Sequence, residues 1–257
     1  MRSGRGPLAS RLLHLPLLML LATATASELR ITGDVLYARR ISIAGLQLTD
    51  CIGEPAMQEG ILRLRAQASC YGGRVTAELS YDPVSGDTTA VIRLRRSSLA
   101  RLIAGLGASG VAASGLIDMD LRLHMPDGDW RRAEGQGRLE LRHGTVLALP
   151  DIANLLLEQD STAGLDHLRT TFLVADGRVL IQGLRLENPA VRVTGSGTIG
   201  LEGDLDLVFN PMARAGLLRR APLVGWLAAN AVRELTRGVV RVRVGGHISA
   251  PTFRTGW

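Results

Sequence analysis

Histidine and aspartate are the side chains whose spacing in this chain could support acid–base or metal chemistry. Asp118, Asp120 and His124 stand at alternate positions of an expected strand, so their side chains point to the same face. This pattern is found in metal sites and also on the solvent-exposed face of a sheet. We favour a solvent-exposed face over a metal site, because no histidine stands at H-x-H or H-E-x-x-H spacing. The histidines that follow residue 26 are His124, His143, His167 and His247.

A glycine-rich segment at 195–200 matches the G-x-G-x-x-G pattern of dinucleotide sites. Such a site needs a strand before the glycines and a helix after them, yet strand-like alternation resumes at Ile199 and continues to Leu207. The chain contains no lysine, which excludes Schiff-base and P-loop chemistry, and it has no G-x-S-x-G elbow. The sequence therefore predicts a protein that is not an enzyme, with no catalytic residues, no metal site and no cofactor.

The clearest structural pattern lies between residues 171 and 210, where apolar and polar residues alternate between glycine-containing turns. A period of two with one apolar parity predicts an antiparallel meander with one apolar and one polar face. That apolar face must be covered, so we expect it to form a groove for a ligand or lipid chain. The residues expected to line the groove are Val179, Ile181, Val191, Val193, Ile199, Leu205 and Leu207.

The remaining chain predicts more strands and a few short helices. Ser97 is the expected N-cap of a helix at 97–106, and further helices are expected at 151–159, 212–219 and 222–236. The fold class is mainly β with short α-helices (α+β), an elongated, curved antiparallel sheet with a groove and a few amphipathic capping helices. The other strands are expected at 29–37, 41–50, 60–69, 73–81, 87–95, 115–124, 134–142 and 239–248.

The first 26 residues have the layout of a targeting segment. Three arginines precede an apolar stretch at 12–21, and small residues at 22–26 fit an A-x-A cleavage site. The apolar stretch is shorter than the ~20 residues of a membrane-spanning helix. We expect a cleaved signal peptide and an exported protein, with an inner-membrane anchor formed by residues 8–26 as the alternative.

Cysteine and arginine give two further expectations. Cys51 and Cys70 could form a disulfide in an oxidising compartment, but they would lie near opposite ends of a hairpin with arms at 41–51 and 61–70. Residues 27–210 hold 19 arginines against 23 acidic residues, whereas residues 211–257 hold eight against one. This asymmetry predicts contact with an anionic membrane surface rather than with nucleic acid. The residues expected there are Arg214, Arg219, Arg220, Arg233, Arg237 and Trp226.

The order of glycines and apolar pairs from 172 to 207 resembles the C-terminal region of the AsmA-like family of envelope proteins. Upstream, GQGRLELRHGTVLALPDIANLL resembles the segment that precedes this region, and VRVRVGGHISAPTFR resembles the closing strand. CYGGRVTAELSYD resembles a hairpin of the family, with Ala77 in place of a glycine. The matching residues of the central segment are Phe172, Asp176, Gly177, Pro189, Gly195, Gly197, Gly203 and Asp206.

The resemblance implies one AsmA-like β-rich domain over 27–257, with 134–257 as its C-terminal region. It also implies a periplasmic, membrane-associated protein that binds or transfers lipid acyl chains in outer-membrane maintenance. The expected partners are phospholipid or a membrane surface, with other envelope proteins next. The alternative is a scaffold or outer-membrane assembly factor that transports no lipid. An open apolar trough would favour the carrier, and a filled, narrow core would favour the scaffold.

Overall fold

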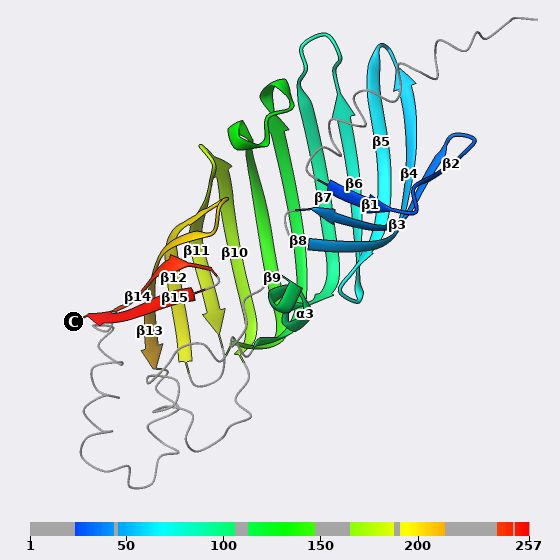
Figure 1. The fold of residues 1–257 in the computed structure, drawn as a ribbon. Coiled ribbons are helices and arrows are strands. Elements are labelled where there is room, and N and C mark those ends of the chain that lie inside the picture. The colour runs from blue at the N-terminus through cyan, green and yellow to red at the C-terminus, as the bar shows by residue number, and fades with distance from the viewer. Residues whose placement is uncertain are drawn as a thin grey trace, which may run out of the picture.

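The computed structural model of the chain describes residues 24–43, 46–105, 113–146, 165–187, 191–213, 241–248 and 250–256. These residues form one antiparallel sheet of fifteen strands. Figure 1 shows the strands side by side in a single curved sheet. A short helix, α3 (Leu99–Gly105), and two 3-10 turns, η1 (Pro126–Gly128) and η2 (Trp130–Arg132), are the other described elements. The expectation of a mainly β, antiparallel fold is therefore confirmed.

The strands follow one another in the sheet almost in chain order. Each strand from β3 onward pairs with the next along the chain, while β1 and β2 both pair with β3. The strands are β1 (Ala24–Ser27), β2 (Arg30–Thr32), β3 (Val35–Ile43), β4 (Leu46–Gln58), β5 (Ile61–Cys70), β6 (Gly73–Tyr81), β7 (Thr88–Ser98), β8 (Ala113–Met125), β9 (Glu134–Val146), β10 (Leu165–Ala175), β11 (Arg178–Glu187), β12 (Val191–Gly200), β13 (Asp204–Ala213), β14 (Arg241–His247) and β15 (Ala250–Gly256).

Two-residue turns set the register of several hairpins. Asp176 and Gly177 both have positive φ, at 51° and 67°, and so do Glu59 with Gly60 and Tyr71 with Gly72. Positive φ at both central residues is the geometry of a type I′ turn, whose twist matches that of the strands it joins. A fixed register keeps the apolar parity of each strand on the same face as that of its neighbours.

The parity of the apolar residues changes once within β11, and a bulge accounts for the change. Ile181 and Leu184 are three positions apart, yet both belong to the same apolar surface. The pairing of β11 with β12 shifts between these two residues, and Gly183 has a φ of 72°. The extra residue restores the alternation on the same face of the sheet.

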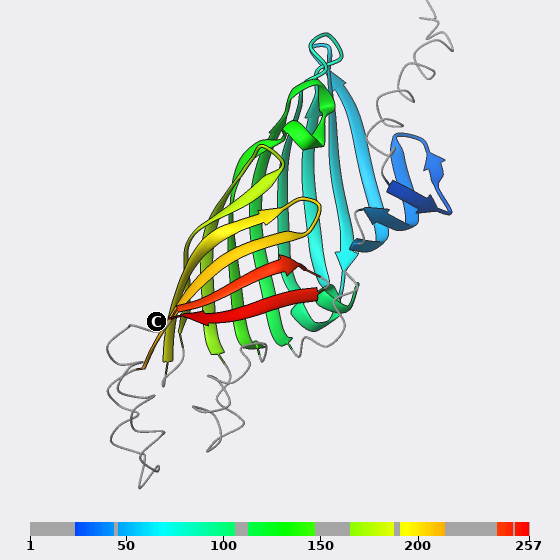
Figure 2. The same cartoon turned by 60° about the vertical axis from the view of Figure 1, so that its left-hand side comes forward.

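The sheet is strongly curved, and its apolar face is on the inside of the curve. A buried cluster on this face runs from Cys70 of β5 through Leu94 of β7 to Leu141 of β9, and Leu48 of β4 packs against it. Helix α3 contacts β4 as well as β7 and β8. A helix that lies over β7 and β8 can also reach β4 where the sheet curves toward it. Figure 2 shows the twist that produces this curvature, with β14 and β15 turned away from the direction of the central strands.

Ser97 was the expected N-cap of α3, but Ser98 takes that role and Ser97 has another. The Ser97 side chain is fully buried, and its Oγ donates a hydrogen bond of 2.7 Å to the carbonyl oxygen of Cys70. The backbone N–H of Arg101 donates instead to Oγ of Ser98, at 3.5 Å. The helix at 97–106 is thus confirmed, but the hydroxyl of Ser98 faces its first turn and Ser97 ties β7 to β5.

Several element boundaries differ from those predicted. The expected strand at 41–50 is divided, because β3 ends at Ile43 and β4 begins at Leu46. β13 continues to Ala213, into the start of the helix expected at 212–219, and β15 was not expected. The helix at 151–159 and nearly all of 212–236 lie outside the described residues. Of the expected helices, α3 is therefore the one that the structure describes.

Candidate binding face

A row of cross-strand partners crosses the concave face from β2 to β15, and every member is apolar or glycine. We call it the long apolar row. Because directly paired residues point to the same side of a sheet, the row is one continuous apolar strip. Its members, in spatial order, are Ile31, Leu36, Gly53, Ala66, Ala77, Ile92, Leu121, Gly137, Phe172, Ile181, Gly197, Leu207, Val244 and Phe253.

A second apolar row runs beside the first, two residues closer to the hairpin turns. It extends from β4 to β15 and again contains no polar side chain. Together the two rows form an apolar surface two residues wide across twelve strands. The members of the second apolar row are Pro55, Leu64, Leu79, Ala90, Leu123, Gly135, Val174, Val179, Ile199, Leu205, Gly246 and Pro251.

Two phenylalanines lie over glycines of this face. A Cβ atom at Gly137 would stand 2.2 Å from the Phe172 ring, and one at Gly195 would stand 2.6 Å from the Phe209 ring. Each ring thus occupies the space that a side chain on the neighbouring strand would need. The missing side chains let the rings lie close to the sheet, and Phe172 is consequently buried.

The expected groove residues are gathered on this one face, but their burial differs. Val179, Ile199 and Leu205 are successive members of the second apolar row, and Ile181 and Leu207 belong to the long apolar row. All five are half-buried. The backbone of Val191 lies in β12, but its side chain is outside the described set.

Val193 lies in a tightly packed part of the face. It is 2% exposed and forms a cluster with Leu184 and Leu186, against which Ile181 and Phe209 pack. A side chain so thoroughly covered contributes to the stability of the sheet rather than to a surface that a ligand could touch.

The convex face carries charge where the concave face is apolar. The Glu140 carboxylate lies 2.9 Å from Nε2 of His167 and 3.2 Å from the guanidinium groups of Arg142 and Arg169. The hydrogen bond from Arg142, followed by that from Arg169, holds the pKa of Glu140 below its usual value. The pKa of Asp120 is lowered in the same way, first by the hydrogen bond from Arg95. These ladders are exposed, so they contribute little to stability, but they keep the outer side of the sheet in water.

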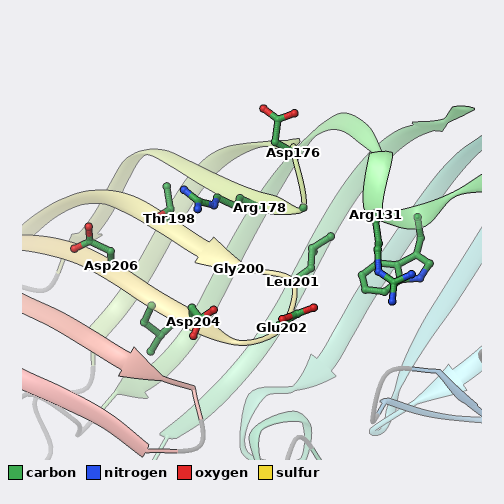
Figure 3. A pocket seen from close by; sticks show the side chains of 12 residues that line it. Arg131, Asp176, Arg178, Thr198, Gly200, Leu201, Glu202, Asp204 and Asp206 are labelled. Atoms are coloured by element: carbon green, nitrogen blue, oxygen red, sulfur yellow. The ribbon is translucent and has the colours of Figure 1, made fainter.

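One hollow of about 460 Å³ lies at the turns that join β10 to β11 and β12 to β13. Figure 3 shows Arg131 of η2 on one side of it and Asp204 and Asp206 of β13 on the other. Asp206 is paired with Arg243 at 3.2 Å, and the Arg131 guanidinium stacks 5.1 Å from the Trp130 ring centre. The hollow brings together carboxylates and arginines, without a serine, cysteine or histidine among its lining residues.

The other sequence candidates for chemistry lie in ordinary structural positions. Gly195 to Gly200 forms the second half of β12 and leads through a turn into β13, so no helix follows these glycines. Within the described ranges, histidine, cysteine and carboxylate side chains do not gather into a group that could hold a metal ion. Over the same part of the chain, none of the helices is both long enough and apolar enough to cross a membrane.

The two cysteines are closer together than expected, and both are free thiols. The arms of their hairpin are 46–58 and 61–70 rather than 41–51 and 61–70, and Thr49 pairs with Ser69. Cys51 and Cys70 therefore both lie close to the Thr49–Ser69 pair and not at opposite ends of the hairpin. Burial raises the pKa of both thiols.

The sequence interpretation missed the part of the face that β2 to β9 contribute. Alternation was present there too, for example at Leu62, Leu64, Ala66 and Ala68, and it could have identified the same parity. The arginines and the tryptophan expected at a membrane surface, from residue 214 to residue 237, lie outside the described residues.

Comparison of the chain with protein-family models, with characterised proteins and with solved structures found no match to any of them.

Proposed function

We propose that this chain is an exported, non-enzymatic envelope protein of the AsmA-like type that binds lipid acyl chains on its concave face. The observation that carries the proposal is the pair of apolar rows, which cross the sheet without one polar side chain. Apolar groups that remain half-exposed over such an area are favourable to cover, at about 25 cal/mol per Å². Acyl chains are flexible and featureless, and they suit a strip that offers apolar contact and no hydrogen bonds.

The dimensions of the face agree with this proposal. Neighbouring strands are about 4.8 Å apart, so the long apolar row follows the sheet for roughly 60 Å. A bilayer core is about 30 Å thick, so the acyl chains of one leaflet extend about 15 Å. The row therefore offers length for several chains, one after another, and no single pocket is required.

The packed region around Val193 supports the alternative function, that of a periplasmic scaffold or assembly factor. Val242 and Val244 of β14 are also buried, at 4% and 6% exposure. A filled core holds the sheet in shape but leaves no room for a ligand at that place. We assign the buried side chains, including Val244 of the long apolar row, to stability and the half-buried members of the two rows to binding. We propose the amphipathic segments 151–159 and 214–236 as capping helices.

Lipid extraction tests the proposed function. Protein purified from the envelope, with residues 1–26 cleaved or retained as an anchor, should carry phospholipid or fatty acid that mass spectrometry detects after solvent extraction. It should also bind a fluorescent fatty acid in the absence of vesicles. Protein that carries no lipid and binds no probe, while circular dichroism shows an intact sheet, would leave the scaffold function in place of the carrier.

The basic segment is proposed to hold the protein at an anionic membrane surface. Replacing Arg219, Arg220 and Arg233 with glutamine should weaken binding to vesicles that contain phosphatidylglycerol by roughly a hundredfold at low salt, since each such charge contributes about 1 kcal/mol. The loss should shrink as salt is added. Vesicle co-sedimentation measures it, and equal binding of variant and wild type at every salt concentration would contradict the proposal.

A further inference from the structure

Large exposed hydrophobic side chains are concentrated at the N-terminal end of the described chain. Leu29, Ile31, Val35 and Tyr37 are 48%, 52%, 37% and 37% exposed, all within nine residues. We call residues 29–37 the N-terminal hairpin, since they contain β2, a turn and the start of β3. Single exposed apolar residues need no explanation, but four in one hairpin mark an interaction surface.

The exposed residues occupy both faces of the hairpin. Ile31 pairs with Leu36 and starts the long apolar row, so it lies on the concave side. Val35 and Tyr37 alternate with Leu36 and therefore lie on the convex side. Folding the sheet more tightly could cover one of these faces but not both. A surrounding apolar medium, into which the hairpin inserts, would cover both together.

The charges beside the hairpin agree with a phospholipid surface. Arg30, Arg39 and Arg40 are exposed, and Glu28 is already paired with Arg39 at 3.1 Å. Arg30 and Arg40 thus remain for lipid phosphates, against the single carboxylate of Asp34 at the turn. Tyr37 adds an amphipathic ring of the kind that gathers at membrane interfaces.

Another exposed hydrophobic side chain provides a contrast. Val84, in the β6–β7 loop, is 94% exposed, more than any of the four hydrophobic residues of the hairpin. It stands between Asp82 and Asp87, however, and the loop from 82 to 87 contains no arginine. A phospholipid surface that carries negative charge would repel this loop and attract the hairpin.

We infer that the N-terminal hairpin inserts into the interface of a phospholipid bilayer and seats the β2 end of the long apolar row on the membrane. Leu29, Ile31 and Val35 enter the acyl region, and Arg30 and Arg40 meet the phosphates. The inference extends the proposed function, because it names the end of the face that receives lipid. Insertion itself does not depend on acyl-chain binding, so the two can be tested separately.

A fluorescent label that reports polarity tests insertion at a single position. Ile31→Cys and Val84→Cys, each labelled with a nitrobenzoxadiazole (NBD) probe, place the same probe on the hairpin and on the acidic loop. Cys51 and Cys70 are buried and their pKa values are raised, so both react slowly with the label. With vesicles of equimolar phosphatidylcholine and phosphatidylglycerol, the probe at 31 should shift to the blue and be quenched by nitroxide-labelled lipid.

The probe at 84 should show neither change. An unshifted probe at 31, or a larger shift at 84 than at 31, would overturn the inference.

Substitutions measure how much the hairpin contributes to binding. Ile31→Ser with Val35→Ser should lower partitioning into both neutral and anionic vesicles by roughly thirtyfold, because two half-exposed aliphatic side chains no longer enter the bilayer. Arg30→Gln with Arg40→Gln should lower it by about thirtyfold on anionic vesicles alone. Val84→Ser removes an exposed aliphatic side chain elsewhere and should change neither value. Equal partitioning of wild type and the Ile31→Ser, Val35→Ser variant would also overturn the inference.

The fluorescent fatty acid assay without vesicles separates this inference from the proposed function. The Arg30→Gln, Arg40→Gln variant leaves both apolar rows unaltered, so it should retain fatty acid binding while it loses binding to anionic vesicles. If wild-type protein binds vesicles through the hairpin but binds no fatty acid, the carrier proposal fails and insertion stands. If it binds fatty acid but the probe at 31 stays in water, insertion fails and the carrier proposal stands.

Discussion

Replacing Ile199 with aspartate should abolish fatty acid binding, with a loss of affinity of at least about a hundredfold. Ile199 is a half-buried member of the second apolar row, between Val179 and Leu205. An acyl chain over this position would bury a carboxylate with no partner, and an unpaired buried charge costs several kcal/mol. Titration of a fluorescent fatty acid into each protein measures the loss.

Leu180→Asp provides a matched control on the opposite face. Leu180 is next to Val179 in β11, is 40% exposed and points to the convex side. The substitution introduces the same side chain into the same part of the sheet. The affinity of the Leu180→Asp variant for the fatty acid should therefore stay within about twofold of wild type, as for most surface substitutions. Equal loss in both variants would show that the charge disturbs the sheet as a whole. Full binding by Ile199→Asp would remove the concave face from the proposed function.

The alternation of apolar and polar residues predicted most of the fold. Between Thr171 and Asn210 it predicted an antiparallel meander with one apolar face, and the structure has β10 to β13 there, because the side-chain period of a strand is a local property. The turn at Asp176 and Gly177 was also readable, since that residue pair favours the positive φ angles found there. These features depend on residues that are close in sequence, so they can be predicted from the sequence alone.

Other features depend on which strands meet, and no local pattern contains that information. The role of Ser97 is set by the Cys70 carbonyl, which is 27 positions earlier in the chain. Its hydroxyl is just as suitable for an N-cap, so the sequence predicts the more frequent role. The long apolar row is likewise a property of register. Its members come from fourteen strands, and a shift of one residue between any two would break it.

The sequence predicted which face of the sheet is apolar, but not which residues of that face remain exposed. Apolar parity identified Val179, Ile181, Ile199, Leu205 and Leu207, which the structure brings together. It could not separate them from Val193, because the same parity serves both packed and half-exposed positions. That difference comes from contacts between strands, because Leu184 and Leu186 of β11 form a cluster with Val193 of β12, and alternation within one strand does not reveal such contacts.

Replacing Gly197 with alanine should destabilise the sheet by about 3 kcal/mol or more, the sum of backbone strain and overpacking. Gly197 is the member of the long apolar row on β12, with a φ of 145°. A Cβ atom there would stand 2.1 Å from the backbone carbonyl oxygen of Asp206 and 2.7 Å from Cα of Leu207. Both are main-chain atoms of the neighbouring strand, so no side-chain rotation could relieve the contact. Urea unfolding followed by circular dichroism measures the change in the free energy of unfolding.

Gly60→Ala separates the two causes. Gly60 also has positive φ, at 81°, but nothing lies within 4 Å of the position of its missing Cβ. Alanine there adds backbone strain alone and should cost about 1 kcal/mol. The excess at Gly197 is then the cost of forcing β12 and β13 apart, where the long apolar row passes from Ile181 to Leu207. Equal costs at the two glycines would mean that the strands can separate freely there, and the row would not need a glycine at this position.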